Sequence, residues 1–150
     1  MLGLVTSFAF ATAGRIVFGA GRATELPAVI GEFGARPMVC TGADPNRFAA
    51  LLTGVADVAW WPVGGEPTLD DVRAGVAAAR AHGADVLVGL GGGAVLDAAK
   101  LIAALVPNEG DVLEYLEVIG AGRPLAATPL SFVAVPTTAG TGSEVTSNGV

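Results

Sequence analysis

Three consecutive glycines, Gly91–Gly93, stand between an apolar run and a segment with helical periodicity. Glycine lets a backbone approach a ligand closely, and the first turn of a helix has N–H groups without helical partners at the positive end of the helix dipole. Both features suit an anion, above all a phosphate group. A tight turn packed against a neighbouring element also uses glycines, so the run by itself leaves a purely structural role open.

A second loop with chemical potential, PTTAGTGSE at residues 136–144, follows another apolar run. Gly140 and Gly142 let a ligand come close, and the hydroxyl groups between them are neutral hydrogen-bond donors. Ligands of open parallel sheets bind beyond the carboxyl ends of the strands, so two such loops predict one site for an extended phosphate-containing ligand. The hydroxyl-bearing candidates are Thr137, Thr138, Thr141 and Ser143.

Two common nucleotide-binding motifs do not account for the glycine run. Residues 89–94 match the spacing of the dinucleotide fingerprint, but that fingerprint places an acid at the end of the next strand, about 20 residues on. Glu109 and Asp111 have that spacing but stand beyond Pro107, where no strand is predicted. A P-loop lysine is preceded by glycine and followed by Ser or Thr, whereas Lys100 has neither neighbour and lies inside the predicted helix.

The elements that position these loops alternate between apolar runs and helix-period segments. Such alternation predicts an α/β fold, a Rossmann-like, mostly parallel sheet flanked by helices. Pro62 places its strand near an edge, and Thr68, Asp71 and Gly83 are cap signals for the helix between them. The predicted strands are 15–19, 37–41, 57–63, 84–90 and 131–135. The predicted helices are 22–34, 46–53, 68–83, 94–106 and a short one within 109–118.

The overall composition excludes several classes of partner. The chain has 150 residues, 52% hydrophobic and 15% charged, with a net charge of −6, which is typical of one well-buried globular domain. A nucleic-acid-binding face needs clustered positive charge, and only eight Lys and Arg residues are scattered here. No stretch is long and apolar enough to span a membrane, and the apolar N-terminus lacks the positive start of a signal peptide. We therefore expect a cytoplasmic protein that binds neither nucleic acid nor membrane, with Cys40 as a buried thiol.

Three motifs in order, FGAG (18–21), GLGGGAVLDAAK (89–100) and VPTTAGTGSEVT (135–146), resemble those of the iron-dependent (group III) alcohol dehydrogenases. The resemblance covers essentially all 150 residues as the N-terminal, NAD(P)-binding domain, with a dehydroquinate synthase-like fold. It implies an oxidoreductase that moves a hydride between a nicotinamide cofactor, NAD or NADP, and an alcohol or aldehyde. It also implies that Gly91, Gly92, Gly93 and Ala94 line the pyrophosphate, with Asp97 in the first turn of the helix. On the nicotinamide side it implies roles for Thr137, Thr138, Thr141 and Ser143.

Several positions qualify what the resemblance implies. The family commonly has serine where this chain has Ala94, so a phosphate contact there uses the backbone only. Many NAD-using members have an Asp where this chain has Gly42; an acid there repels a 2′-phosphate, so Gly42 leaves room for NADP, although Asp44 is available as a substitute. Glu66 falls near the adenosine end and is equally explained as a solvated loop acid. Asp97 is stabilised by the helix dipole with or without a ligand.

The resemblance implies that the catalytic divalent metal, Fe or Zn, is bound by an Asp and three His of a C-terminal helical domain. This chain has one histidine, His82, which we expect to be a surface imidazole at a helix C-terminus. We therefore expect residues 1–150 to hold no metal site and no catalytic residue, and to be catalytically silent alone as part of a longer two-domain protein. The resemblance also suggests a homodimer in which the apolar segment 4–19 adds a strand across the interface.

Other functions remain open at this point. A maleylacetate reductase, glycerol dehydrogenase or dehydroquinate synthase relative would share the glycine-rich and threonine-rich loops, although the motif at 135–146 favours the alcohol dehydrogenase branch. A nucleotide-binding module without chemistry would also fit a chain that lacks metal ligands.

Overall fold

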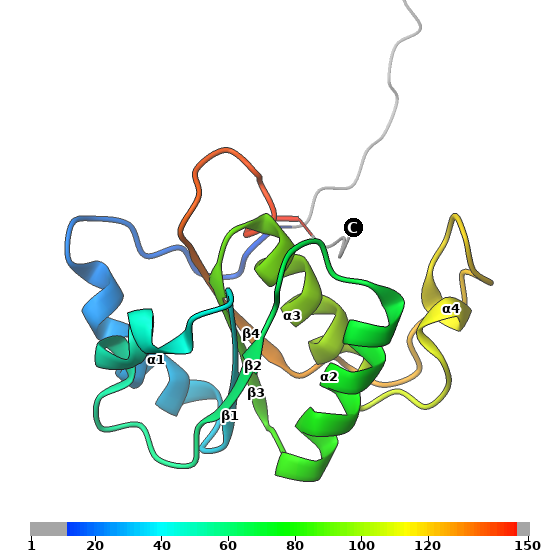
Figure 1. Ribbon diagram of the computed structural model, residues 1–150, viewed down its shortest axis with the longest axis horizontal. Coiled ribbons are helices and arrows are strands. Elements are labelled where there is room, and N and C mark those ends of the chain that lie inside the picture. The colour runs from blue at the N-terminus through cyan, green and yellow to red at the C-terminus, as the bar shows by residue number, and fades with distance from the viewer. Residues whose placement is uncertain (1–11, 147–150) are drawn as a thin grey trace, which may run out of the picture.

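A four-stranded, wholly parallel sheet forms the centre of the molecule (Figure 1). The computed structural model describes residues 12–146. The strands lie in the order β2-β1-β3-β4, so β2, which ends at Pro62, is an edge strand as predicted. Their bounds are β1 Pro37–Thr41, β2 Ala59–Pro62, β3 Val86–Gly91 and β4 Ser131–Pro136. The predicted α/β class with a parallel sheet is confirmed.

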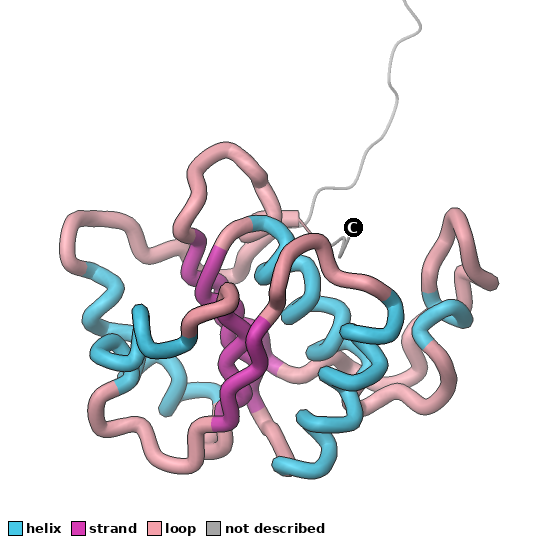
Figure 2. The backbone as a smooth tube through the Cα atoms, in the orientation of Figure 1, coloured by secondary structure: helices cyan, strands magenta, loops and turns pink. Residues whose placement is uncertain are grey.

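Helices cover both faces of this sheet, as Figure 2 shows. α1 and the 3₁₀ helix η2 lie on one face and α2 and α3 on the other, whereas α4 lies beyond the end of α3 (Figure 1). Their bounds are η1 Arg22–Glu25, α1 Leu26–Phe33, η2 Pro45–Leu52, α2 Leu69–His82, α3 Gly93–Leu105 and α4 Val112–Tyr115.

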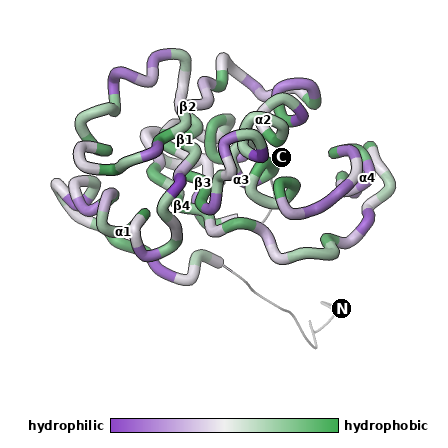
Figure 3. The backbone as a smooth tube through the Cα atoms, turned by 90° about the horizontal axis from the view of Figure 1, so that it is seen from below, coloured by the Kyte–Doolittle hydropathy of each residue, from purple (hydrophilic) through white to green (hydrophobic). Residues whose placement is uncertain are grey.

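The core has two parts because successive strand residues point to opposite faces of a sheet. Met38, Cys40 and Leu87 pack with α2 and α3, whereas Val39 and Val88 pack with α1 and η2. All of β1 and β3 is buried, which explains their continuous apolar sequences. Figure 3 shows the apolar strands at the centre and hydrophilic stretches mostly in the outer turns. Burial also raises the pKa of the Cys40 thiol to about 12, as expected of an inert buried cysteine.

Side chains cap η2, α2 and α4, whereas α1, like α3, has no side-chain hydrogen bond at its N-cap. Thr68 precedes α2, and its hydroxyl oxygen accepts from the Asp71 N–H while the Asp71 carboxylate accepts from the Thr68 N–H, a capping box. Gly83 ends α2 in the left-handed conformation, with φ of 70°. Asp111 and Glu114 form a second capping box at α4. The caps predicted for α2 are therefore confirmed.

Some predicted elements differ from the structure. No strand forms at 15–19: Phe18 is 96% exposed, and Arg15 pairs with Glu32 of α1 instead of a sheet neighbour. The helix expected at 46–53 is the 3₁₀ helix η2, and the one within 109–118 is only the short α4.

Two further expectations concern His82 and the N-terminal apolar segment. His82 is only partly exposed, and its buried Nε2 has no hydrogen-bond partner within residues 12–146. The expected surface imidazole is therefore wrong. Residues 1–11, which include half of the apolar segment 4–19 expected to cross a dimer interface, lie outside the described residues, and dimerisation stays a prediction.

Candidate dinucleotide-binding site

The strand order places the turn after β1, which contains Gly42, and the glycine run after β3 at the same end of the sheet, and we call the region between them the crevice. The chain leaves β1 through η2 on one face and leaves β3 through α3 on the other, so β1 and β3 flank the point where the connections diverge. Open α/β sheets bind ligands at this point, beyond the carboxyl ends of the strands. Thr41 pairs with Leu90 in the register, so Gly42 and the glycine run emerge at one edge of the sheet, the upper edge in Figure 1.

The glycine run joins β3 to α3 without a side-chain cap. Gly91 is the last residue of β3, Gly92 is the N-cap of α3, and the first helical hydrogen bond joins the Leu96 N–H to the Gly92 oxygen at 3.1 Å. Gly92 has no side chain to accept from the first N–H groups of α3, so these donors and the positive end of the helix dipole face the crevice.

The threonine-rich loop lies directly against this turn. The Thr137 N–H donates to the Gly91 oxygen at 2.8 Å. A Cβ at Gly92 would lie 3.2 Å from Thr138 Oγ1, and a Cβ at Gly93 would lie 3.2 Å from both Ser143 Oγ and Thr141 Cβ. Side chains at these glycines would therefore fill the space between turn and loop. The structure brings together the two loops that the sequence singled out.

Asp97 lies in the second turn of α3, not in the first as predicted, because the helix begins at Gly93, and it connects α3 to the same loop. Its carboxylate accepts from Ser143 Oγ at 3.2 Å and forms an ion pair with Lys100 Nζ at 3.0 Å. Lys100 Nζ also lies 3.1 Å from Thr146 Oγ1. The sequence suggested a surface or ion-pairing role for Lys100; the ion pair is confirmed, but the side chain is only 11% exposed. A three-residue spacing on one helix face was the signal for this pair.

The residues assigned to the adenosine end lie farther from these contacts. A Cβ at Gly42 would meet nothing within 4 Å, so the end of β1 has open space. Glu66 is exposed on the loop after β2, one strand farther out. Asp44 accepts from the Asn46 N–H at 3.0 Å as the cap of η2. The structure thus places Gly42 beside the glycine run and leaves Glu66 at the periphery.

One polar atom of the loop was missed by the sequence analysis. Glu144 Oε2 is buried, and it has no hydrogen-bond partner in the described part of the chain. A buried acceptor without a donor is costly unless a ligand or another group supplies one. The N–H donors at the start of α3 and the hydroxyl groups of the facing loop fit a dinucleotide. By contrast, residues 12–146 contain no group of three or more His, Cys, Asp or Glu side chains placed to hold a metal ion.

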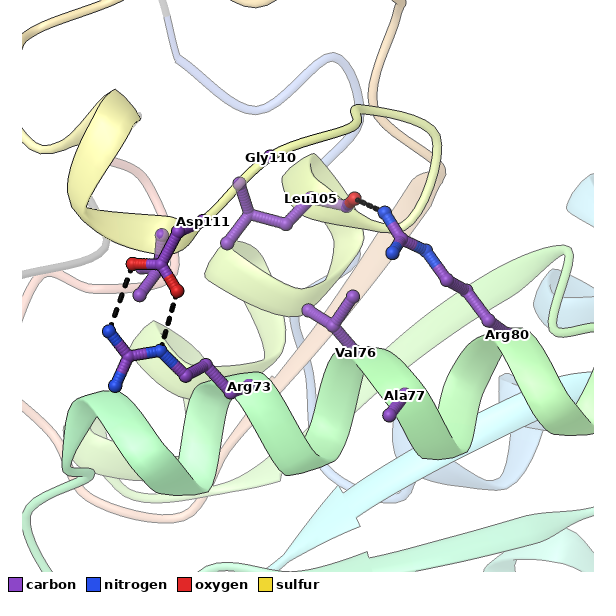
Figure 4. A pocket seen from close by; sticks show the side chains of 8 residues that line it. Arg73, Val76, Ala77, Arg80, Leu105, Gly110 and Asp111 are labelled. Atoms are coloured by element: carbon purple, nitrogen blue, oxygen red, sulfur yellow. Dashed lines mark hydrogen bonds and ion pairs between the residues drawn. The ribbon is translucent and has the colours of Figure 1, made fainter.

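The opposite end of α3 has no such free groups. Arg80 of α2 donates to the backbone oxygens of Leu105, Val106 and Asn108 at 2.7–3.0 Å, and so closes the C-terminus of α3. Figure 4 shows the bond to Leu105. Arg73 forms a two-bond ion pair with Asp111 beside it. Arg73, Arg80, Leu105 and Asp111 line a cavity of about 120 Å³, but Arg73 and Asp111 are paired with each other and Arg80 already donates to backbone oxygens. The glycine end of α3 is therefore the better ligand site.

The model of one protein family, iron-containing alcohol dehydrogenase, matches residues 13–150. The chain belongs to this family. A probable alcohol dehydrogenase, EutG, from Salmonella typhimurium is 46% identical over 102 residues, which are 68% of this chain and 25% of the relative. A phosphonoacetaldehyde reductase from Streptomyces viridochromogenes is 46% identical over 131 residues, 83% of this chain and 31% of that protein.

Solved structures of iron-type alcohol dehydrogenases and their relatives share the fold. Sulfoacetaldehyde reductase from Bifidobacterium kashiwanohense, in complex with NAD⁺, superposes with a TM-score of 0.78 at 26% identity, over 93% of this chain and 38% of that one. A 1,3-propanediol oxidoreductase superposes with a TM-score of 0.79 at 28% identity and the same coverage. The chain thus spans well under half the length of these relatives. Within the described residues, no helix is both long and apolar enough to cross a membrane.

Proposed function

We propose that this chain forms the NAD(P)-binding domain of an oxidoreductase that interconverts an alcohol and an aldehyde. The observation that carries the proposal is the uncapped start of α3 at Gly92, which faces the hydroxyl-bearing loop across a gap that a Cβ would fill. Family membership supports the same reading. The nicotinamide, when bound, would supply or accept the hydride. The glycine run and the loop after β4 would bind and orient the dinucleotide.

The pyrophosphate would bind at the glycine run. The N–H groups that open α3, those of Gly93 and Ala94 first, would donate to its oxygens, with help from the helix dipole. Gly91 and Gly92 would let the phosphates come close to the backbone. Ala94 has a methyl group where many family members have a hydroxyl, so its contact would be through the backbone alone.

The nicotinamide half would lie along the loop after β4. Thr137, Thr138 and Thr141 are exposed there, and their hydroxyl groups would donate to the ribose or the carboxamide. Ser143 and Asp97 already bond to each other at 3.2 Å, and they would form the floor beneath that half. Together these residues would orient the ring and exclude water from one side of it.

The adenosine half would lie past Gly42, with Glu66 at its rim. The open space at Gly42 supports NADP as well as NAD, because no side chain there opposes a 2′-phosphate. Two structural relatives have names that point to NAD: the sulfoacetaldehyde reductase above binds NAD⁺, and butanol dehydrogenase A of Thermotoga maritima is described as NADH-dependent, at a TM-score of 0.75 and 26% identity.

Residues 12–146 do not fit a catalytic metal, so no step through one is assigned to them. We infer that Fe or Zn would be bound by further residues of a longer protein and that the 150-residue chain alone binds cofactor without turning over substrate. A probable glycerol dehydrogenase from Sinorhizobium meliloti shares the fold at a TM-score of 0.67 and 26% identity. A glycerol dehydrogenase relative, a maleylacetate reductase or a binding module without chemistry would use the same crevice.

The direct test is fluorescence titration of the 150-residue chain with NADH and NADPH, repeated with Gly92→Val. Gly31→Val is the matched control, because Gly31 is exposed on α1 and a Cβ there meets nothing within 4 Å. We expect saturable binding by the wild-type chain and by Gly31→Val, and loss of binding by Gly92→Val with the circular dichroism of a folded chain. Equal binding by all three, or no binding by the wild-type chain, would contradict the proposal.

A further inference from the structure

The Asp97–Lys100 ion pair differs from the other ion pairs of the described residues in its burial. Its side chains are 21% and 11% exposed, whereas every side chain of the other pairs is at least 39% exposed. A pair removed from water in this way interacts more strongly than an exposed one, and the loss of one partner leaves an uncompensated charge. Loss of the pair should therefore disturb the groups that it contacts.

Both members of the pair contact the loop after β4. Ser143 Oγ donates to Asp97 Oδ2 at 3.2 Å. Lys100 Nζ donates to Thr146, to Oγ1 at 3.1 Å and to the backbone oxygen at 3.4 Å. The loop is thus tied to α3 at two points, on the C-terminal side of the residues that face the glycine run.

The loop needs such ties because of its own sequence. Gly140 and Gly142 have φ values of 92° and 75°, a conformation that glycine adopts easily but whose ordering is entropically costly. Most of residues 137–142 are exposed, so burial of apolar side chains does little to hold them. If the loop is already ordered before the ligand arrives, the entropic cost of ordering it does not reduce the free energy of binding.

We propose that Lys100 is a positioning residue for the dinucleotide site, which acts through Asp97 and Thr146 to hold the loop 137–146 over the glycine run. The inference rests on the proposed cofactor-binding function. Lys100 itself touches no cofactor in this account. Lys100 raises the affinity for the cofactor because it holds the loop in its binding conformation before the cofactor arrives.

The test combines amide hydrogen exchange of the ligand-free chain with NADH titration. Lys100→Met removes the cation and keeps much of the side-chain volume. Lys100→Arg keeps the cation and serves as the conservative rescue. Thr146→Val removes one acceptor and covers the case in which Lys100→Met does not fold. Arg73→Met is the matched control, since it breaks an ion pair between α2 and Asp111, away from the site.

In Lys100→Met we expect the hydrogen-bonded amides of the loop, those of Thr137, Ser143 and Val145, to exchange roughly tenfold faster. We expect the Kd for NADH to rise by roughly tenfold, the equivalent of about 1.4 kcal/mol. Thr146→Val should raise the exchange rate of the loop amides and the Kd for NADH by less than Lys100→Met does. Lys100→Arg should keep both values near those of the wild-type chain, and Arg73→Met should change neither value.

Each departure from this pattern has a definite meaning. A higher Kd without faster loop exchange would overturn the inference, because Lys100 would then contact the cofactor directly. Faster exchange with an unchanged Kd would also overturn it, because the ties would be structural only. If the wild-type chain binds neither NADH nor NADPH, the proposed function fails first, and the exchange data then describe a structural tie and nothing more.

Discussion

α2 and α3 begin in opposite ways, although both follow parallel strands of one sheet. Thr68 and Asp71 satisfy the first N–H groups of α2 with their own side chains, and Asp111 and Glu114 do the same for α4. α3 begins at Gly92, with no side-chain cap. In the proposed function, α2 uses its helix start for its own stability, whereas α3 leaves the N–H donors at its start to a ligand.

The surroundings of the two helix starts follow the same division. Thr68 is exposed, next to a loop that ends at Pro67. Gly92 and Gly93 lie against Thr138, Thr141 and Ser143, which are polar but contribute no cap to α3. Sites that bind ligands often carry groups that a purely stable protein would have paired.

A cap installed on α3 should have the largest effect on binding. Gly92 has φ of −79° and ψ of −176°, which suits an N-cap aspartate, so Gly92→Asp should fold. Its carboxylate would accept from the donors meant for the pyrophosphate and repel the phosphates. Loss of even one hydrogen bond to a charged group costs roughly 1.5–3 kcal/mol, so we expect the Kd for NADH to rise by roughly 10- to 100-fold or more. Fluorescence titration measures it, and unchanged affinity would refute the role of this helix start.

A carboxylate at the other glycine of the crevice should affect one cofactor only. Gly42→Asp has open space around the new Cβ, and opposed unit charges of like sign at 4 Å cost about 1 kcal/mol in water. A 2′-phosphate carries more than one charge, so we expect the Kd for NADPH to rise by roughly tenfold while that for NADH stays or falls. Parallel titrations of Gly42→Asp and the wild-type chain with NADPH and NADH measure these changes in Kd. An equal change for both would place Gly42 outside the adenosine end.

Removal of the cap from α2 should cost stability but not binding. Thr68→Ala deletes the hydroxyl that accepts from Asp71 N–H, and loss of an N-cap threonine destabilises a protein by about 1 kcal/mol. Urea denaturation should show this loss, and NADH titration should show the wild-type Kd. A loss of NADH binding free energy as large as the loss of stability would mean that the two helix starts do not differ in function.

The cap of α4 should give a small pH dependence. Hydrogen bonds from the Arg73 guanidinium and the Leu113 N–H lower the pKa of Asp111 to about 2. Because the pKa of an unfolded aspartate is about 3.9, this contribution to folding is fully present above pH ~4 and is lost as the pH falls through ~2. The stability gap between wild type and Asp111→Asn should therefore narrow from pH 6 to pH 2.5. High salt should shrink it too, because the pair is exposed.

What the sequence predicted well were features that a few neighbouring residues determine. The cap signals at Thr68, Asp71 and Gly83 and the buried strands β1 and β3 depend on local chemistry and on an uninterrupted apolar run. Ligand binding by the glycine run stays a prediction; what the structure shows is that the threonine-rich loop lies beside it.

The errors and omissions arise from contacts between distant parts of the chain. Residues 15–19 have strand-forming side chains, but a strand needs a partner, and Arg15 binds Glu32 of α1 instead. The contact of Lys100 with Thr146 joins residues 46 positions apart, which no local pattern shows. The burial of Glu144 Oε2, which has no hydrogen-bond partner among residues 12–146, likewise depends on how the loop folds back.

The central claim is that the start of α3, and not that of α2, receives the cofactor. The most direct measurement is a titration of the ¹⁵N-labelled chain with NADH, followed by ¹H–¹⁵N correlation spectra. The account predicts that amide resonances of residues 91–94 and 137–143 shift in a saturable way while those of residues 68–71 stay in place. Spectra in which residues 91–94 do not move, or in which residues 68–71 move as much, would contradict it.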